Sequence, residues 1–360
     1  MADSVYIHIP FCKSKCKYCS FISFPNMEKK LGYFFSLLKE IDTNYNGEEL
    51  KTLYFGGGTP SLMEVDHLKK IINKFNFQEN CEITLELNPD DANLEYLKSL
   101  KEIGINRLSI GSQSFDNDIL QIIGRRHSAE QTIQAVKFAK EAGFNNISLD
   151  LIYGLPQQTM ESLKKDLEIL TELNIQHIST YGLKIEEGSY FHKNLPQNLP
   201  DDDLQADMYL EVNKYLESKN YRRYEISNFA LEGYESRHNL NYWDNEEYYG
   251  FGISAHGYID GIRYSNFTTF EEYMNNPAQH ECGHFQTEKE KLEEEIFLGF
   301  RKESGININK INSQYNIDFE KEYKTVLDKF SPKYMTKTPL GYKLTLDGVM
   351  LSNNILCEFI

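Results

Sequence analysis

VYIHIPFCKSKCKYCSF, residues 5–21, joins a short strand-like run to a loop that holds three of the chain's six cysteines. Cys12, Cys16 and Cys19 are spaced C-x3-C-x2-C, and no fourth cysteine follows nearby. Structural zinc usually takes four ligands in two close pairs, but the sequence has no second pair and His8 lies at no familiar finger spacing. An iron–sulfur cluster fits better, because three thiolates on a four-iron cluster leave one iron open to another ligand.

A regular alternation of elements follows over the first half of the chain. β-rich runs alternate with helical patterns, several of which end in glycine, a common residue just after a helix. This order predicts βα units around a parallel sheet, and six units favour a partial (β/α)6 barrel. Active sites of such folds lie at the carboxyl ends of the strands, where the cysteine loop also begins. The predicted strands are 5–9, 51–55, 82–87, 106–110, 146–152 and 177–183.

The sequence divides the chain into three predicted parts. Residues 1–184 hold the α/β barrel core, and residues 185–284 form an irregular extension that completes it. Residues 285–360 have the pattern of helices followed by a hairpin over 334–351, which predicts a small winged-helix-like domain. Such a domain often binds DNA, but the chain is acidic, so we expect a lid or a partner-docking surface instead.

The overall composition excludes further function classes. The 360 residues carry a formal charge of −16, with 38 Lys and Arg against 54 Asp and Glu, which argues against nucleic acid as a partner. The sequence shows no signal-peptide pattern and no run of about 18 apolar residues. We therefore expect a cytoplasmic protein with reduced thiols, whose membrane contact, if any, is peripheral.

The cysteine spacing after a first strand, in a chain of βα repeats, resembles the radical S-adenosylmethionine (SAM) superfamily. The resemblance implies a 4Fe-4S cluster on Cys12, Cys16 and Cys19, with SAM on the open iron. In that superfamily an electron from the cluster cleaves SAM and yields a 5′-deoxyadenosyl radical. Tyr18, directly before the last cysteine, matches the aromatic ring that packs near the cofactor in the family.

A second motif, YFGGGTPS at 54–61, agrees with this resemblance. Alone, a run of glycines after a strand indicates only a tight turn. After the second strand of this architecture it matches the glycine-rich loop of the superfamily, where missing side chains let the backbone approach the amino-acid end of SAM. We therefore expect Gly57, Gly58 and Thr59 to contact SAM.

Six motifs in order narrow the resemblance to the coproporphyrinogen dehydrogenase-like (HemN/HemW) branch. They are YIHIPFC, GGGTPS, ELNP (86–89), INRLSIGSQSF (105–115), GRRHS (124–128) and DLIYGLPQQT (150–159). The resemblance implies further SAM contacts, in which carboxylates bind ribose hydroxyls and the ammonium group and a guanidinium binds the carboxylate. Arg126 stays an alternative to Arg125, because the sequence does not fix which side chain points inward. The implied contacts are Tyr6, Glu86, Gln113, Arg125, Asp150 and, for a second SAM position, Lys184.

Two functions of this branch differ at a few positions. The oxygen-independent coproporphyrinogen III oxidase usually has a fourth cysteine two residues after the third, where this chain has Phe21, and a longer N-terminal extension. RHNLNYW at 237–243 instead matches the H-N-x-x-Y-W motif of the HemW-like haem chaperones. His238 is a candidate axial haem ligand and His8 a candidate haem contact; a packed, hydrogen-bonded histidine is the alternative for each.

These motifs together predict a haem chaperone that carries a 4Fe-4S cluster and SAM and delivers haem to respiratory membrane enzymes. The predicted partners are haem, haem-accepting enzymes and an electron donor. We expect coproporphyrinogen III oxidase activity to be absent. The alternatives are that oxidase, a radical SAM methyltransferase or haem-modifying enzyme of the same branch, or a metal-binding interaction protein on a degenerate barrel.

Overall fold

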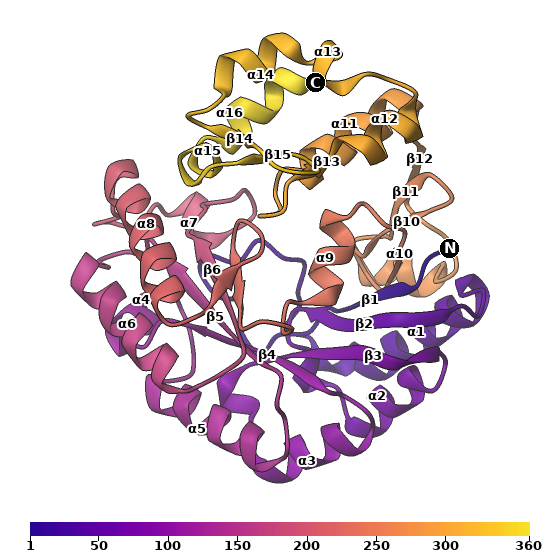
Figure 1. Ribbon diagram of the computed structural model, residues 1–360. Coiled ribbons are helices and arrows are strands. Elements are labelled where there is room, and N and C mark those ends of the chain that lie inside the picture. Colours follow the sequence, from indigo (N-terminus) through magenta and orange to yellow (C-terminus); the bar gives the residue numbers. More distant parts are fainter.

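The computed structural model describes residues 1–360 and contains the predicted partial barrel. Six parallel strands lie side by side in chain order, with helices on their outer face (Figure 1). The strands are β1 (Ser4–Ile9), β2 (Glu49–Gly57), β3 (Asn76–Leu87), β4 (Arg107–Gln113), β5 (Ile147–Tyr153) and β6 (His177–Gly182). The helices between them and after β5 are α1 (Lys30–Asn44), α2 (Val65–Ile72), α3 (Leu94–Glu102), α4 (Asn117–Ile122), α5 (Ala129–Glu141) and α6 (Met160–Glu172).

The two faces of each strand differ in polarity. On β1, Val5, Ile7 and Ile9 are fully buried in the core shared with the helices, whereas the alternate residues Tyr6 and His8 face the inside of the barrel. The other five strands repeat this alternation, with side chains such as Glu86 and Asp150 on the inner face. Packed α/β barrels usually fill their interior with branched apolar residues. A polar interior is therefore a specific property of this chain, and it places functional groups inside the barrel.

The extension after β6 completes the sheet at both of its edges. One edge gains β9 (Tyr249–Phe251), parallel to β1. The other gains β8 (Asn228–Ala230), antiparallel to β6, and then β7 (Arg222–Arg223), antiparallel to β8. The same part of the chain forms a separate three-stranded sheet. Its further elements are α7 (Tyr190–Lys193), α8 (Asp202–Ser218), α9 (Arg237–Trp243), β10 (His256–Ile259), β11 (Ile262–Ser265), α10 (Phe270–Asn275) and β12 (Cys282–Phe285).

The C-terminal part has its own hydrophobic core, which includes Ile296, Phe300 and Phe319. The predicted hairpin is present as β14 and β15, but the residues after Thr345 form helices, because its hydroxyl accepts a hydrogen bond from the Gly348 amide and caps a new helix. The elements are α11 (Glu288–Gly299), β13 (Ile306–Asn307), α12 (Ile308–Tyr315), α13 (Phe319–Glu322), α14 (Lys324–Phe330), β14 (Met335–Lys337), β15 (Gly341–Leu344), α15 (Leu346–Met350) and α16 (Ser352–Leu356).

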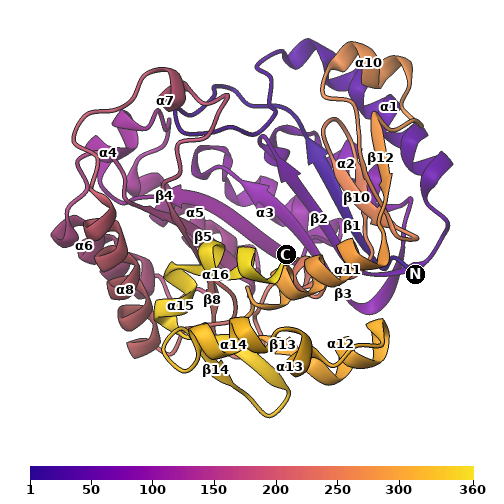
Figure 2. The same ribbon diagram turned by 90° about the horizontal axis from the view of Figure 1, so that it is seen from above.

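This C-terminal part lies at the end of the barrel where the strands begin (Figures 1 and 2). The ion pairs Lys302–Asp244 and Arg223–Glu303 join it to the residue after α9 and to β7. Helix α9 itself covers the starts of β2 and β3, since Arg237 donates to the carbonyls of Lys51 and Asn80. The expectation that this part is a lid over the site is therefore wrong, because it packs at the opposite end. No helix in the structure is long and apolar enough to cross a lipid bilayer.

Candidate functional site

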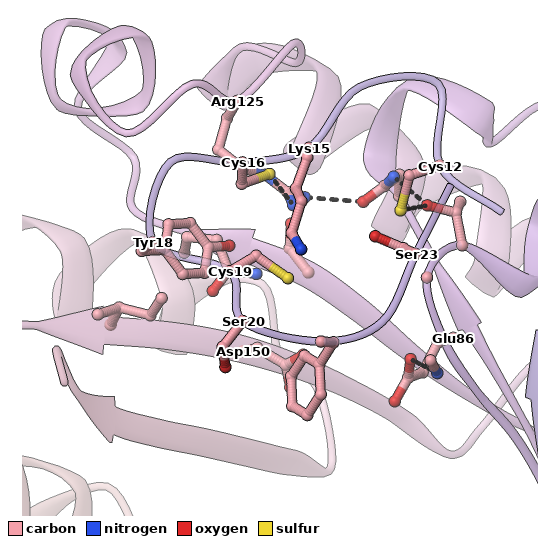
Figure 3. A pocket seen from close by; sticks show the side chains of 18 of the residues that line it. Cys12, Lys15, Cys16, Tyr18, Cys19, Ser20, Ser23, Glu86, Arg125 and Asp150 are labelled. Carbon is pink, nitrogen blue, oxygen red and sulfur yellow. Dashed lines mark hydrogen bonds between the residues drawn. The ribbon is translucent and has the colours of Figure 1, made fainter. Parts of the chain in front are cut away.

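A cavity of about 430 Å³ opens at the carboxyl ends of the barrel strands. The cysteine loop, the glycine loop after β2 and the ends of β3 to β6 form its walls, and Figure 3 shows the side chains that point into it. Its size lies within the range of about 300–1,000 Å³ that is usual for ligand sites. Twelve residues predicted from the sequence line it: Cys12, Cys16, Tyr18, Cys19, Gly57, Gly58, Thr59, Glu86, Gln113, Arg125, Asp150 and Lys184.

Backbone hydrogen bonds hold the cysteine loop in place. The two sides of its base are joined where Cys12 donates to the carbonyl of Phe24 and Phe24 donates to that of Pro10. At the far side of the loop, Lys17 donates to the carbonyl of Ile123, just after α4. Phe11 anchors the base, since its buried ring packs edge-on to Tyr33 at 5.5 Å. The loop thus holds its cysteines over the strand ends through the chain's own contacts.

The three cysteine thiols are free and point into the cavity from different sides (Figure 3). The sulfur of Cys12 lies 3.5 Å from the hydroxyl of Thr59, and that of Cys16 accepts from Nη1 of Arg125 at 3.5 Å. Burial raises the pKa of the Cys19 thiol to about 11. No three His, Cys, Asp or Glu side chains converge as a single metal ion would require. Three cysteine thiols facing one cavity are the ligand type that iron–sulfur clusters use.

The glycine loop owes its composition to the chain's own packing. Gly57 has φ +114, and a β-carbon there would lie 2.7 Å from the His8 ring. At Gly58 a β-carbon would lie 2.6 Å from the carbonyl oxygen of Phe11. The missing side chains thus let β1 and the start of the cysteine loop pack closely against β2. Both glycines also line the cavity. This position is compatible with the predicted contact to a ligand, which stays a prediction.

Two carboxylates project into the cavity from β3 and β5. Glu86 accepts hydrogen bonds from the Tyr54 hydroxyl at 2.9 Å and the Gly57 amide at 3.1 Å. Burial, and then the charge of Asp150, raise the pKa of Glu86 to about 7. Burial also raises the pKa of Asp150, although a hydrogen bond from Ser179 opposes this. The two side chains can accept hydrogen bonds from hydroxyl or ammonium groups, and Glu86 is only partly charged near neutral pH.

The structure decides between the two neighbouring arginines. Arg125 turns into the cavity, where its guanidinium donates to Asn88 Oδ1 at 2.9 Å and to the carbonyl of Gly111 at 2.6 Å. Its Nε is buried and has no hydrogen-bond partner. Arg126 does not line the cavity, and its guanidinium forms an ion pair with Asp90 at 2.7 Å. Of the two arginines, Arg125 is therefore the one placed to meet an anionic group in the cavity.

Gln113 reaches the cavity through an irregularity of β4. Its φ of +67 is unusual for a residue other than glycine, and the pairing of β4 with β5 shifts between Ile110 and Gln113. Such bulges often re-aim a side chain next to a functional site. The sequence motif predicted this residue, but the backbone distortion could not be predicted from it.

Three predicted residues lie outside the cavity lining. His8 is 5% exposed, and its ring nitrogens contact the Tyr6 hydroxyl at 3.0 Å and the carbonyl of Ile22 at 2.9 Å. His238 is 1% exposed, and its nitrogens contact the hydroxyls of Thr52 at 2.7 Å and Tyr242 at 2.8 Å. In this arrangement neither histidine has a nitrogen free to bind iron. Their predicted contact with haem, and that of Tyr6 with SAM, find no support in this geometry.

The structure adds lining residues that the sequence interpretation did not assign. Asn88 orients Arg125, Ser109 donates to Asp150 at 3.4 Å, and the hydroxyl of Ser23 is buried without a partner. Lys15, Phe21 and Tyr181 form part of the rim. The strand alternation could have indicated Ser109, which lies four residues before Gln113 on β4.

Comparisons with known proteins agree with this geometry. Residues 6–170 match the model of the radical SAM superfamily, and residues 286–351 match that of the HemN C-terminal domain. The chain is 37% identical to the haem chaperone HemW of Lactococcus lactis, over 99% of this chain and 97% of that protein. It is also 37% identical to HemW of Bacillus subtilis, over 99% of both chains. The solved structure of coproporphyrinogen III oxidase (HemN) from Escherichia coli superposes with a TM-score of 0.87, over 99% of this chain and 89% of that one; at 23% identity this likeness shows the fold alone.

Proposed function

This chain belongs to the HemW family of radical SAM proteins, and from that premise we propose that it is a haem chaperone: it binds haem as cargo and delivers it to respiratory enzymes of the membrane. The observation that carries the proposal is the cavity itself, where the predicted cluster and SAM residues meet in a chain that matches HemW proteins over nearly its whole length. Radical SAM membership implies a 4Fe-4S cluster and SAM.

We assign the cluster to Cys12, Cys16 and Cys19. The assignment is supported by their free thiols and by their common cavity. When bound, such a cluster can pass one electron to SAM. The chain's own contribution is to hold the thiols apart on an anchored loop and to place the Arg125 guanidinium beside Cys16.

We assign SAM to the floor of the same cavity. Arg125 is suited to its carboxylate, since the buried Nε still lacks a partner. Glu86 and Asp150 are suited to its hydroxyl or ammonium groups, because hydrogen bonds from Tyr54 and Ser109 already orient them. Tyr18, Gln113 and Thr59 shape the remaining wall, to which Gly57 and Gly58 also contribute.

Haem as cargo, and not as a substrate for decarboxylation, is the favoured interpretation of the site. The curated relatives that match almost the full chain carry the name haem chaperone, whereas the oxidase shares only the fold. Phe21 occupies the position at which the oxidase usually has a fourth cysteine, and its ring stands at the cavity rim. The recipient enzymes, the electron donor and a peripheral membrane contact are parts of the proposal that require their own tests.

One experiment separates the chaperone from the oxidase. Anaerobically reconstituted protein is titrated with ferric haem and, separately, incubated with coproporphyrinogen III, SAM and a reductant. We expect a shifted Soret band and no vinyl product. Stoichiometric decarboxylation of the propionates would establish the oxidase instead, and an unshifted Soret band together with failed haem transfer to an acceptor membrane would remove the chaperone.

A further inference from the structure

The rim of the cavity carries an unusual pair of exposed aromatic rings. Phe21, on the cysteine loop, is 66% exposed. The ring of Tyr181, near the end of β6, is 42% exposed, while its hydroxyl approaches Ser179 on the same strand. Both line the cavity, and they come from elements that are far apart in sequence. Exposed apolar rings beside a ligand cavity usually mark a surface that another molecule covers.

The same two elements also supply cations. Lys15 stands on the cysteine loop and extends toward Cys19, and Lys184 lies shortly after β6 (Figure 3). Both are exposed; Lys184 has only a surface pairing with Glu186, at 2.9 Å and with its side chain 81% exposed. Surface pairs of this kind contribute little and exchange readily. Each side of the mouth therefore carries one ring and one available ammonium group, although the whole chain has a charge of −16.

We propose that this rim, formed by Lys15, Phe21, Tyr181 and Lys184, is the docking surface for the haem plane, and that bound haem closes the cavity over SAM. This inference rests on the proposed chaperone function and adds the place and orientation of the cargo. Haem is a planar apolar ring with two carboxylates. It pairs with two aromatic rings by stacking and with two ammonium groups by charge.

Space inside the cavity supports the mouth as the site. The cavity of about 430 Å³ is already assigned to the cluster and SAM, so a macrocycle has room only above them. The buried histidines offer no competing site, since both nitrogens of His8 and of His238 are hydrogen-bonded. An acidic electron-donor protein could pair with the lysines, but it would not account for the exposed aromatic rings. A lipid bilayer is flat and does not fit a concave rim.

The arrangement has a kinetic consequence. If haem lies across the opening above the bound SAM, SAM cannot leave the cavity while haem is bound. Bound haem should therefore slow the dissociation of SAM. Reciprocity between two ligands applies to their equilibrium affinities and not to their rates. A slower release of SAM therefore reports that haem blocks the shared opening, and it does not require a change in SAM affinity.

The test uses reconstituted holoprotein loaded with SAM and the variants Phe21→Ala and Lys15→Glu/Lys184→Glu. Phe35→Ala is a matched control, because Phe35 on α1 is 60% exposed and does not line the cavity; Lys69→Glu on α2 is the control for charge. Haem affinity is measured by Soret titration, and SAM release by a chase with unlabelled SAM. We expect each rim variant to weaken haem about tenfold and both controls to bind haem as the parent does. Haem should slow SAM release in the parent and in both controls, but not in the rim variants at the same haem concentration.

The possible outcomes separate the docking surface from the chaperone function. If the parent protein binds no haem, the proposed function fails and the docking surface fails with it. If the parent binds haem but the rim variants bind it equally well and SAM release is unchanged, the docking surface is wrong while the chaperone function stands. The docking surface is also wrong if the rim variants lose only SAM affinity, or only their rate of reduction by an acidic donor protein.

Discussion

Polar groups at the cavity end of the barrel interior differ from the two buried histidines toward its far end in how their hydrogen bonds are satisfied. At the cavity end, Arg125 Nε and the Ser23 hydroxyl are buried without partners, and the cysteine sulfurs have only contacts at 3.5 Å. At the far end, His238 and His177 each have both ring nitrogens hydrogen-bonded; the nitrogens of His177 contact the hydroxyls of Ser148 at 2.7 Å and Tyr224 at 2.8 Å.

This difference separates binding groups from scaffold. A buried polar group without a partner costs free energy, so it persists where a ligand or water satisfies it. A polar group whose hydrogen-bond partners all come from the chain stabilises the fold and has no free donor or acceptor for a ligand. On this argument the histidines hold α9 and the strands together, while the opposite end is the proposed cofactor site. The contrast applies to the histidines and not to every polar group at that end, since Arg107 Nε, Thr84 Oγ1 and both carboxylate oxygens of Glu225 are also buried without partners.

The largest expected effect is a loss of iron, which should follow substitution of a cavity cysteine but not of a cysteine in the hydrophobic core. Cys16→Ala should lose nearly all iron from the reconstituted protein, because a cluster with only two thiolates left is not held. Cys81→Ala is the matched control, since Cys81 is buried in the hydrophobic core on β3 and away from the cavity. Iron analysis and the visible absorption band measure both. Full iron content in Cys16→Ala would contradict the cluster assignment.

A second prediction concerns the carboxylates of the cavity. Because the pKa of Glu86 is raised to about 7, its protonated fraction grows as the pH falls below 7, and it loses its capacity to accept hydrogen bonds from SAM. SAM affinity should fall toward acid pH by up to about tenfold per pH unit below 7. Glu86→Gln should bind SAM weakly and with a flatter pH profile. A wild-type profile that stays flat between pH 8 and 6 would show that Glu86 does not bind SAM through its charge.

A third prediction concerns the far end. His238→Ala should lower the free energy of unfolding by about 2–4 kcal/mol, because it leaves Thr52 and Tyr242 without partners, while the haem spectrum stays unchanged. Exposed His284→Ala should cost little. An altered Soret band in His238→Ala would instead restore His238 as a haem ligand and remove the contrast between the two ends.

The pH dependence of this variant gives a second measurement. Burial lowers the pKa of His238 from 6.5 to about 3, so its contribution to stability is fully present above pH 6.5 and is lost as the pH falls toward 3. The difference in unfolding free energy between wild type and His238→Ala should therefore narrow by about 1.4 kcal/mol per pH unit below 6.5. Denaturant titrations at pH 8, 6 and 5 measure it. A difference that widens toward acid pH would show that the histidine is charged in the folded protein.

The smallest effect is expected for Lys184 toward SAM. Its exposed ammonium group lies at the mouth beside Glu186, away from the floor. Lys184→Ala should change SAM affinity by no more than about twofold, in line with the weakness of exposed ion pairs. Arg125→Lys provides the contrast and should weaken SAM clearly, because a lysine cannot donate in a fork. A large loss of SAM affinity in Lys184→Ala would support the second SAM contact that the family resemblance implied.

Much of the fold could be predicted because its signals are local. Strands β1 to β6 and the intervening helices follow from alternating polarity and from glycines after helices, which depend on neighbouring residues alone. The helices after Thr345 were missed, because LTLDGVML has too short a pattern to distinguish a strand from a capped helix. The inward turn of Arg125 and the outward turn of Arg126 could not be predicted either, since they depend on Asn88 and Asp90, which follow another strand.

The sequence alone was enough to predict the family, the barrel and the residues that meet in one cavity, because strand ends in a parallel sheet converge wherever their motifs occur. The state of each side chain required the three-dimensional arrangement. His8 and His238, which are good metal ligands by residue type, use both nitrogens on neighbours that are distant in sequence. Gly57 is small because His8 packs against it. Hydrogen-bond saturation and close packing are properties of three-dimensional neighbours, and a motif does not contain them.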